Sequence, residues 1–291
     1  LPLLLSYITC YIRRTIVMKY SASAMTEPKI KEQVIQDVVL MKFVGINPVV
    51  GHGGGPEINA MLEKIGKESR FVEGNRVTDL ETVEIVEMIL SGKVNKDLVS
   101  NINRHGGRAI GLSGKDDNMI LVEKKFIEKD GEIIDIGYVG EIKEINTDII
   151  DMLDFNNYIP VISTIGVDKE GQTYNINADY VAGEIAGKIK ADRLIFLTDV
   201  DGIMQDHTNK ETLISDITRK EVEILIADGT ISGGMLPKVE TCLHALKKGV
   251  ENVIILNGKI EHSILLELFT EEGAGTLIKE NKTQEDITWK Q

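Results

Sequence analysis

Pro48-Val49-Val50-Gly51-His52-Gly53-Gly54-Gly55-Pro56-Glu57 is an apolar run that breaks into glycines immediately before a helix pattern begins. The apolar part predicts a buried strand, and a proline suits the first position of the helix that follows. Glycines let the main chain approach a charged group closely, and the free N–H groups of a helix start attract anions. The segment therefore indicates an anion-binding turn, with a tight strand-to-helix connection that binds nothing as the simpler alternative.

Strands and helices alternate on both sides of this glycine turn. Apolar and β-branched runs predict strands at residues 15–18, 44–50, 109–113, 120–123, 159–165, 193–198 and 252–256. Helical spacing predicts helices at residues 3–12, 28–40, 59–65, 80–90, 178–188, 220–227 and 238–248, and glycines mark hairpins at 130–131 and 169–171. This alternation predicts a mostly parallel α/β sheet with helices on both faces. Ligands of such sheets bind beyond the carboxyl ends of the strands, where Lys19, Gly53–Gly55 and Asp199 fall.

Composition narrows the class of protein. With 291 residues, 42% of them hydrophobic, the chain is long enough for one large or two fused α/β domains. A net charge of −13 argues against nucleic acid or a membrane surface as a partner, and no apolar run reaches the length of about 18 residues that a membrane helix needs. Cys10 and Cys242 lie in no metal-binding spacing, so we expect structural thiols, a reducing compartment and no metal site.

Two lysines stand where a phosphate group would need a positive charge. Lys19 ends the first predicted strand, and Lys238 follows the glycine pair of Ser232-Gly233-Gly234-Met235-Leu236-Pro237-Lys238 at the start of a helix. For each of them, a solvated surface lysine is the simpler alternative.

Three further segments carry more polar groups than local structure requires. The segment Asn175–Asp179 holds two amides and a carboxylate before a helix, although capping needs only one of them. A buried strand ends in Thr198-Asp199-Val200-Asp201-Gly202, for which a simple turn is the alternative. Arg76 lies in an extended stretch and has the forked guanidinium that suits a carboxylate, although a surface ion pair explains it equally well.

The missing motifs restrict the chemistry. The sequence contains no Gly-x-x-x-x-Gly-Lys-Ser/Thr loop, no Gly-x-Gly-x-x-Gly motif, no nucleophile elbow and no metal cluster. The remaining inventory is a set of glycine amides and lysines with one organising acid. That inventory suits direct phosphoryl transfer, in which positioning and charge neutralisation supply most of the catalysis.

Taken in order, these segments resemble the N-acetyl-L-glutamate kinases of the amino-acid kinase superfamily, over roughly residues 7–278. The matching motifs are H-G-G-G-P at 52–56, G-x-R-x-T at 74–78, N-x-N-A-D at 175–179, T-D-V-x-G at 198–202 and G-G-M-x-P-K at 233–238. The resemblance implies a three-layer α/β/α sandwich that transfers the γ-phosphoryl group of ATP, carried with Mg²⁺, to N-acetyl-L-glutamate. This is a step of arginine biosynthesis.

The resemblance also implies a role for each motif. Lys19 and Lys238 would flank the migrating phosphoryl group, and Asp179 would hold both ammonium groups. Gly54 and Gly55 would offer N–H groups to the phosphoryl oxygens, while Arg76 and Asn175 would bind acetylglutamate. The nucleotide would contact Thr198, Asp199, Val200, Gly202, Gly233 and Gly234. No general base is needed, because the γ-carboxylate of the substrate is already ionised at pH 7.

One position departs from the family pattern. The family writes its first turn K-Y-G-G, whereas this chain has Lys19-Tyr20-Ser21-Ala22. Side chains restrict the backbone there and add bulk beside the phosphates. We therefore expect Ser21→Gly combined with Ala22→Gly to raise kcat in a steady-state assay, and an unchanged or lower kcat would contradict this.

The chain ends resemble those of arginine-sensitive members of the family. Such members form homohexamers, as trimers of dimers, through an N-terminal helix and bind L-arginine beside it. The resemblance places Tyr7, Glu267 and Gly273 at this effector site and implies feedback inhibition by arginine. The alternative is that the helix merely docks on its own lobe. Plastid and cyanobacterial members also meet a PII-type nitrogen regulator.

The resemblance divides the chain into three parts. Residues 1–14 would form the oligomerisation helix, residues 15–190 a lobe for acetylglutamate binding and dimerisation, and residues 191–291 a lobe for ATP and arginine. Lysine outnumbers arginine and isoleucine is abundant, which is typical of an AT-rich genome such as a plastid's. We therefore expect a chloroplast stroma location, with a bacterial cytoplasm as the alternative.

Two other functions stay open. Carbamate, aspartate and uridylate kinases share the glycine turn and the fold, but not Arg76 together with the segment Asn175–Asp179. The Ser21-Ala22 change also allows a weakened, arginine-binding regulator, against which the presence of Lys19, Asp179 and Lys238 argues.

Overall fold

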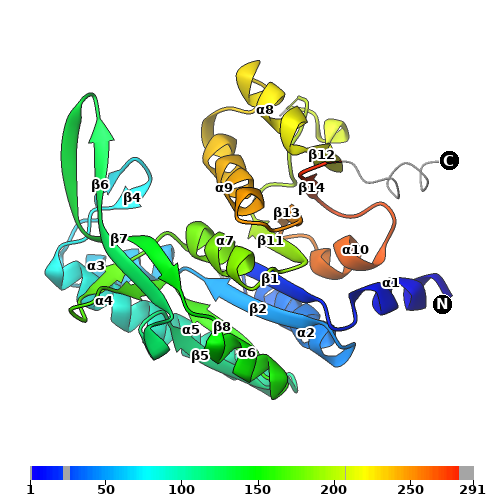
Figure 1. Cartoon of the computed structure of the whole chain (residues 1–291), viewed down its shortest axis with the longest axis horizontal. Coiled ribbons are helices and arrows are strands. Elements are labelled where there is room, and N and C mark those ends of the chain that lie inside the picture. The colour runs from blue at the N-terminus through cyan, green and yellow to red at the C-terminus, as the bar shows by residue number, and fades with distance from the viewer. Residues whose placement is uncertain (1, 22–26, 207, 282–291) are drawn as a thin grey trace.

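A computed structural model describes residues 2–21, 27–206 and 208–281, and its centre is an eight-stranded sheet (Figure 1). From one edge to the other, its strands are β12 (Asp216–Thr218), β14 (Thr276–Lys279), β13 (Asn252–Asn257), β11 (Arg193–Thr198), β1 (Thr15–Tyr20), β2 (Asn47–His52), β8 (Ile159–Ser163) and β5 (Ala109–Ser113). Every neighbouring pair is parallel except β13 and β14. The predicted mostly parallel sheet is confirmed.

Helices cover both faces of this sheet (Figure 1). Because side chains alternate along a strand, successive residues of β1 enter different cores: Ile16 and Met18 pack on one face and Val17 on the other. The first core includes residues of α2 (Pro28–Phe43), α3 (Gly55–Lys64), α4 (Leu80–Glu87), α5 (Asn95–Arg104) and α10 (Ser263–Phe269). The second includes residues of α6 (Asp148–Phe155), α7 (Ala178–Lys188), α8 (Arg219–Ala227) and α9 (Leu236–Lys247). Two cores on opposite faces make the predicted three-layer α/β/α sandwich, which is confirmed.

A second, smaller sheet lies at one end of the molecule. It is made of β6 (Ile120–Lys129), β7 (Glu132–Ile145), β9 (Ile165–Val167) and β10 (Thr173–Asn175). Its β6–β7 hairpin projects beside the short pair β3 (Phe71–Val72) and β4 (Asn75–Arg76) (Figure 1). The hairpins that the sequence predicts at residues 130–131 and 169–171 are both present, as β6–β7 and β9–β10.

Some predicted boundaries were wrong. The helix predicted for residues 80–90 continues as a π-helical segment, Met88–Val94, that runs directly into α5, which the sequence pattern did not predict. The strand predicted for residues 44–50 is β2, which begins only at Asn47, because Val44 caps α2 and Gly45 has a left-handed φ of 90° that ends the helix. Strands β12 and β14 and helices α6 and α10 were also missed.

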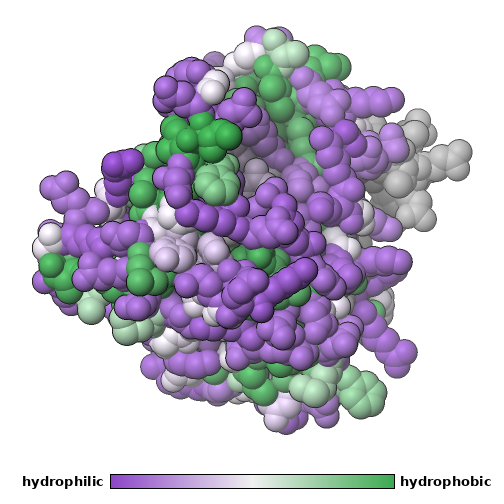
Figure 2. All heavy atoms as spheres, turned by 60° about the vertical axis from the view of Figure 1, so that its left-hand side comes forward, coloured by the Kyte–Doolittle hydropathy of each residue, from purple (hydrophilic) through white to green (hydrophobic). Residues whose placement is uncertain are grey.

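The N-terminal helix is α1 (Pro2–Tyr11), and it contacts α10 at the opposite end from the hairpin (Figure 1). On the face shown in Figure 2, hydrophilic residues predominate and hydrophobic ones form scattered patches. None of the helices in the described part of the chain is long and apolar enough to cross a membrane. The division of the chain at residues 14 and 190 stays a prediction.

Candidate active site

The carboxyl ends of β1, β2, β8 and β11 meet at one edge of the sheet. Lys19 in β1 lies between Gly51 of β2 and Phe196 of β11 in the strand register. The glycine turn follows β2 directly, and Asp199 follows β11. Parallel pairing therefore brings together residues that lie up to 180 positions apart in the chain.

A cavity of about 260 Å³ opens at this edge. Most of its lining comes from the predicted acetylglutamate and phosphoryl residues: Lys19, Gly53, Gly54, Gly55, Arg76, Asn175 and Asp179. Phe71 and Thr164 also line it, although neither is among the site residues predicted from the sequence. Phe71 had no motif to mark it, and Thr164 was hidden inside the apolar run at 159–165.

A second, smaller cavity adjoins the first. It is lined by Lys19, Asp179, Thr198, Asp199 and Lys238, among others. Because Lys19 and Asp179 line both cavities, they stand at the boundary between them. The two lysines that the sequence separates by more than 200 positions therefore face the same space.

The ion pairs of the two lysines differ from the arrangement expected from the sequence. Lys19 Nζ lies 2.8 Å from Asp179 Oδ1, whereas Lys238 Nζ lies 3.1 Å from Asp199 Oδ1. The expectation that Asp179 holds both ammonium groups is therefore corrected for this structure, in which each lysine has a carboxylate of its own. The hydrogen bond from Lys238 keeps the pKa of Asp199 below its usual value. Each cation is thus held in place by an anion before a ligand enters.

Arg76 is almost completely buried at the wall of the first cavity. Its Nη1 donates to Ser69 Oγ at 2.6 Å, its Nη2 lies 3.5 Å from Gly55 O, and its guanidinium stacks 4.7 Å from the centre of the Phe71 ring. Burial lowers its pKa, but a guanidinium stays protonated in proteins. A fixed, buried cation beside a polar cavity is suited to bind a carboxylate.

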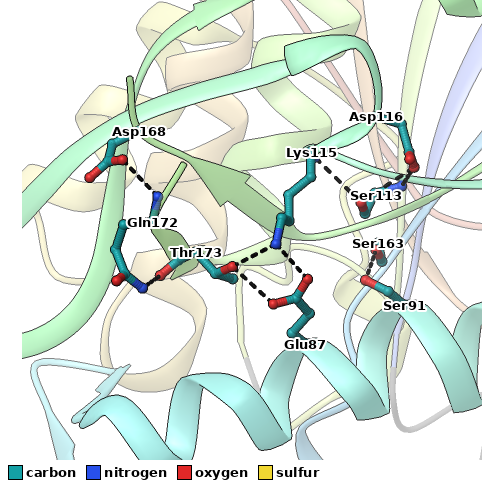
Figure 3. Close-up of polar contacts among 9 residues, drawn as sticks. All are labelled: Glu87, Ser91, Ser113, Lys115, Asp116, Ser163, Asp168, Gln172 and Thr173. Atoms are coloured by element: carbon teal, nitrogen blue, oxygen red, sulfur yellow. Dashed lines mark hydrogen bonds and ion pairs between the residues drawn. The ribbon is translucent and has the colours of Figure 1, made fainter. Parts of the chain in front are cut away.

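A polar network fixes the strand that carries Asn175 (Figure 3). Glu87 at the end of α4 accepts a hydrogen bond from Lys115 Nζ at 2.8 Å and another from Thr173 Oγ1 of β10 at 2.9 Å. Lys115 also donates to Thr173 Oγ1 at 3.0 Å, which closes the triangle. Asn175 lies two residues further along β10, so this network positions it at the cavity.

Within the glycine turn, Gly54 has no room for a side chain, whereas a Cβ at Gly55 would meet nothing within 4 Å. A Cβ at Gly54 would lie 2.7 Å from Leu90 Cδ2, and that leucine belongs to the π-helical segment. Gly54 caps α3 and Gly55 is its first residue, so their N–H groups have no partner within the helix. Both glycines line the first cavity, so their N–H groups are available to an anionic ligand there.

His52 immediately precedes this turn and is completely buried. Burial lowers its pKa from 6.5 to about 4, so its ring is neutral at pH 7. In the unfolded chain the ring binds a proton at higher pH, so this group contributes stability above pH 6.5 that is lost as the pH falls.

We therefore expect His52→Asn to flatten the pH dependence of stability. Between pH 7 and pH 5, the wild type should lose about 2 kcal/mol more unfolding free energy than the variant, as measured by urea unfolding. Burial raises the pKa of Asp37 to about 6, which acts in the opposite direction, but Asp37 is present in both proteins and cancels in the comparison. Parallel curves for the two proteins would contradict the prediction.

The predicted nucleotide residues lie around the ends of β11 and α9. Thr198 Oγ1 accepts a hydrogen bond from the Val200 N–H at 3.2 Å, which shapes the turn before Gly202. A Cβ at Gly202 would lie 2.4 Å from Thr276 Oγ1, and Gly233 has a φ of 55°. Gly234 follows in the turn that leads to Lys238. In the described residues, no group of three or more His, Cys, Asp or Glu side chains is placed to hold a metal ion.

A third cavity, of about 440 Å³, lies between α1, α10 and the β14 end of the sheet. It brings together the three predicted effector residues, Tyr7, Glu267 and Gly273. Glu267 Oε2 accepts hydrogen bonds from the Ala274 and Gly275 N–H groups at 2.7 and 3.1 Å. Its lining also holds the acids Asp216, Glu271 and Glu272 and one base, Arg193. Although Asp216 is paired with Lys279, acids still outnumber the base, so the cavity favours a cationic ligand.

Comparison with known proteins shows which family this chain belongs to. The profile of the amino acid kinase family matches residues 14–257. The chain is 54% identical to the acetylglutamate kinase of Methanocaldococcus jannaschii over 279 residues, which covers 94% of this chain and 93% of that one. It is 51% identical to the acetylglutamate kinase of Nitrosococcus oceani over 283 residues, covering 94% of this chain and 93% of that one.

Solved structures show the same fold. The N-acetylglutamate synthase of Neisseria gonorrhoeae, in complex with coenzyme A and N-acetyl-glutamate, superimposes with a TM-score of 0.83 at 23% identity, covering 97% of this chain and 63% of that one. The carbamate kinase of Giardia superimposes with a TM-score of 0.67 at 16% identity, covering 92% of this chain and 99% of that one. At these identities the likeness shows the fold alone.

Proposed function

Because the chain belongs to the amino acid kinase family, and within it to the acetylglutamate kinases, we propose that it transfers the γ-phosphoryl group of ATP to the γ-carboxylate of N-acetyl-L-glutamate. The product is N-acetyl-L-glutamyl 5-phosphate, an intermediate of arginine biosynthesis, and ADP leaves. One observation carries the assignment of the site: two adjoining cavities share Lys19 and Asp179 at their boundary. Acetylglutamate would occupy the first cavity, which is the larger of these two, and the end of the nucleotide would occupy the second.

The transfer itself needs positioning and charge neutralisation. A γ-carboxylate oxygen attacks the γ-phosphorus as the bond to the β,γ-bridging oxygen breaks, and the electron pair of that bond leaves with ADP. Lys19 and Lys238 neutralise the transferred group from two sides, and the N–H groups of Gly54 and Gly55 bind its oxygens. Asp179 and Asp199 hold the lysines in place before the substrates bind. Mg²⁺, which we expect to arrive on the phosphate oxygens, supplies further neutralisation when bound.

Substrate choice rests on the residues at the far side of the larger cavity. Arg76 would pair with the α-carboxylate of acetylglutamate, and Asn175 would donate its amide to the same molecule. The buried and stacked position of Arg76 keeps the guanidinium fixed, which favours one binding geometry.

An ADP-release assay with a panel of acceptors tests this function. We expect ADP release to depend on N-acetyl-L-glutamate and to be absent with carbamate, aspartate or UMP. Activity with another acceptor would instead indicate another amino acid kinase. Inactivity combined with arginine binding would indicate a regulator.

Inhibition by arginine is part of the proposal and rests on the third cavity. Its acidic lining complements the guanidinium and the α-ammonium group of L-arginine, and Tyr7 lies on the α1 side of it. Arginine bound there would bridge α1 and α10, two elements that already touch.

Glu267→Gln separates the charge of this cavity from its shape. A glutamine oxygen still accepts from the Ala274 and Gly275 N–H groups, so the loop keeps its hydrogen bonds. The lost charge should raise the half-inhibitory arginine concentration about 10- to 100-fold, with kcat unchanged in the absence of arginine. The matched control is Glu251→Gln, which changes an exposed acid outside this cavity and should leave inhibition intact. Equal inhibition of both variants would refute the site.

Assembly and location follow from the resemblance alone. A homohexamer formed through α1, a PII-type partner and a chloroplast stroma location stay predictions. The relatives compared above come from bacteria and archaea, which fits the alternative of a bacterial cytoplasm. Sedimentation of the purified protein with and without residues 1–14 tests the hexamer.

A further inference from the structure

Asn95 and His52 form a buried pair behind the glycine turn. Both side chains are completely inaccessible to solvent, and Asn95 Nδ2 lies 3.1 Å from His52 Nε2. The other ring nitrogen, His52 Nδ1, lies 2.9 Å from Gly53 O. The pair therefore reaches from the first residue of α5 to the turn that would hold the phosphoryl group.

The surroundings of Asn95 decide which ring nitrogen carries the proton. Asn95 Nδ2 also faces Val161 O at 2.9 Å and Leu112 O at 3.4 Å. Carbonyl oxygens only accept hydrogen bonds, and Lys96 Nζ donates to Asn95 Oδ1 at 3.2 Å, so the NH₂ end of the amide faces the carbonyls and the ring. Of its two hydrogens, we assign one to Val161 O, the nearer carbonyl, and the other to the ring. His52 Nε2 must then be the acceptor, and the proton of the neutral ring lies on Nδ1. That N–H donates to Gly53 O.

This hydrogen bond fixes a peptide plane of the turn. Gly53 C=O and Gly54 N–H belong to the same peptide group, and no cis peptide occurs among the described residues. In a trans peptide these two groups point in opposite directions. Holding the carbonyl on His52 therefore aims the Gly54 N–H away from the ring.

Asn95 directly follows the π-helical segment. Met88–Val94 is π-helical, a rare conformation that often occurs at functional sites, and α5 begins at the next residue. Leu90 and Val94 of this segment lie close to Gly54. A Cβ at Gly54 would be 2.7 Å from Leu90 Cδ2 and 3.1 Å from Val94 Cγ2. On the other side of Asn95, a Cβ at Gly111 would lie 1.8 Å from Asn95 Oδ1. The amide is thus enclosed between β5 and the turn.

We propose that Asn95 is a positioning residue for phosphoryl transfer, which fixes the His52 tautomer and thereby aims the Gly54 N–H at the transferred group. The proposal rests on the proposed function. Neither residue lines the two adjoining cavities, so both would act through Gly54. Asn95 also ties β5 and β8 to the turn through Leu112 O and Val161 O.

The tautomer is measured without any assay of activity. In protein labelled with ¹⁵N-histidine, long-range ¹⁵N–¹H spectra distinguish a protonated ring nitrogen from a bare one, and the His52→Asn spectrum identifies the signal among the five histidines. We expect wild-type His52 to be the neutral Nδ1–H form at pH 7. Asn95→Ala should mix the two tautomers, because Nε2 loses its donor. A wild-type ring protonated on Nε2 at pH 7 overturns the proposal.

Two variants of His52 separate positioning from packing. Asparagine places an NH₂ group where His52 Nδ1 stands, so His52→Asn keeps a donor for Gly53 O. Leucine has nearly the same shape as asparagine but no donor, so His52→Leu removes this hydrogen bond. We expect His52→Asn to keep kcat within about threefold and His52→Leu to lose about 10- to 100-fold, with the KM for acetylglutamate little changed in both. Equal losses of kcat would overturn the proposal.

Failure of this inference is distinguishable from failure of the proposed function. A wild type without acetylglutamate-dependent ADP release overturns the function. An active wild type whose His52 variants lose kcat equally, or whose ring carries its proton on Nε2, overturns only the positioning role of His52 and Asn95.

Discussion

Replacing Lys19 by methionine is expected to lower kcat about 10²- to 10³-fold, with a much smaller change in the KM for acetylglutamate. The size follows from about 3–4 kcal/mol of charge stabilisation that exists mainly in the transition state. Methionine keeps most of the length of lysine but carries no charge. The carboxylate of Asp179, which lies 2.8 Å from Lys19 Nζ, would then face the anionic substrates without its partner.

A double variant separates the effect of the unpaired Asp179 carboxylate from the effect of the lost lysine charge. Asp179→Asn in the Lys19→Met background removes the unpaired carboxylate, so the double variant should not be slower than the single one. Non-additivity of this kind is expected for residues that act as one unit. A double variant as slow as the product of the two single losses would mean that the two residues act independently.

Lys29→Met is the matched control for Lys19→Met. Lys29 also pairs with an acid, Glu261, but its side chain is 76% exposed and lies outside both cavities. Steady-state kinetics should show wild-type kcat for this variant. If Lys19→Met kept kcat within threefold of the wild type, Lys19 would have no part in phosphoryl transfer.

Helix and strand bounds were predicted most accurately where residues next to the ends of the element define them. Helix α7 has the predicted bounds because Asn177 caps its start, with its side chain accepting from the Asp179 N–H at 2.8 Å. Strand β11 likewise matches its apolar run at residues 193–198. In contrast, the π-helical segment contains Ser91 and Gly92, which weaken a helix pattern, so the continuation into α5 was missed.

The residues of the candidate site could be predicted from the sequence, but the ion pairs and hydrogen bonds between them could not. The motifs contain Lys19, Asp179, Asp199 and Lys238, yet no local pattern says which acid pairs with which lysine. The triangle of Glu87, Lys115 and Thr173 joins three elements that are far apart in the chain, so spacing gives no sign of it. Such pairings are set by tertiary packing. Ala22, part of the departure from the family pattern, lies outside the described residues.

Replacing Arg76 by lysine is expected to raise the KM for acetylglutamate about 100-fold. The guanidinium presents a planar fork that binds both oxygens of a carboxylate, whereas an ammonium group offers a single point of charge. Lysine would also lose the stacking on the Phe71 ring and the hydrogen bond to Ser69 Oγ, which together fix the side chain in the wall of the cavity. A factor of 100 corresponds to about 2.7 kcal/mol, within the range for a hydrogen bond to a charged group.

Arg70→Lys is the matched control, because Arg70 lies six residues away, is exposed and does not line the cavity. Its KM for acetylglutamate and for ATP should equal the wild-type values. For Arg76→Lys, the KM for ATP should also stay near the wild-type value, since Arg76 lines only the larger cavity. A selective loss of affinity for acetylglutamate places the acceptor in that cavity. A rise in the KM for ATP alone would instead mean that the two cavities hold the opposite substrates.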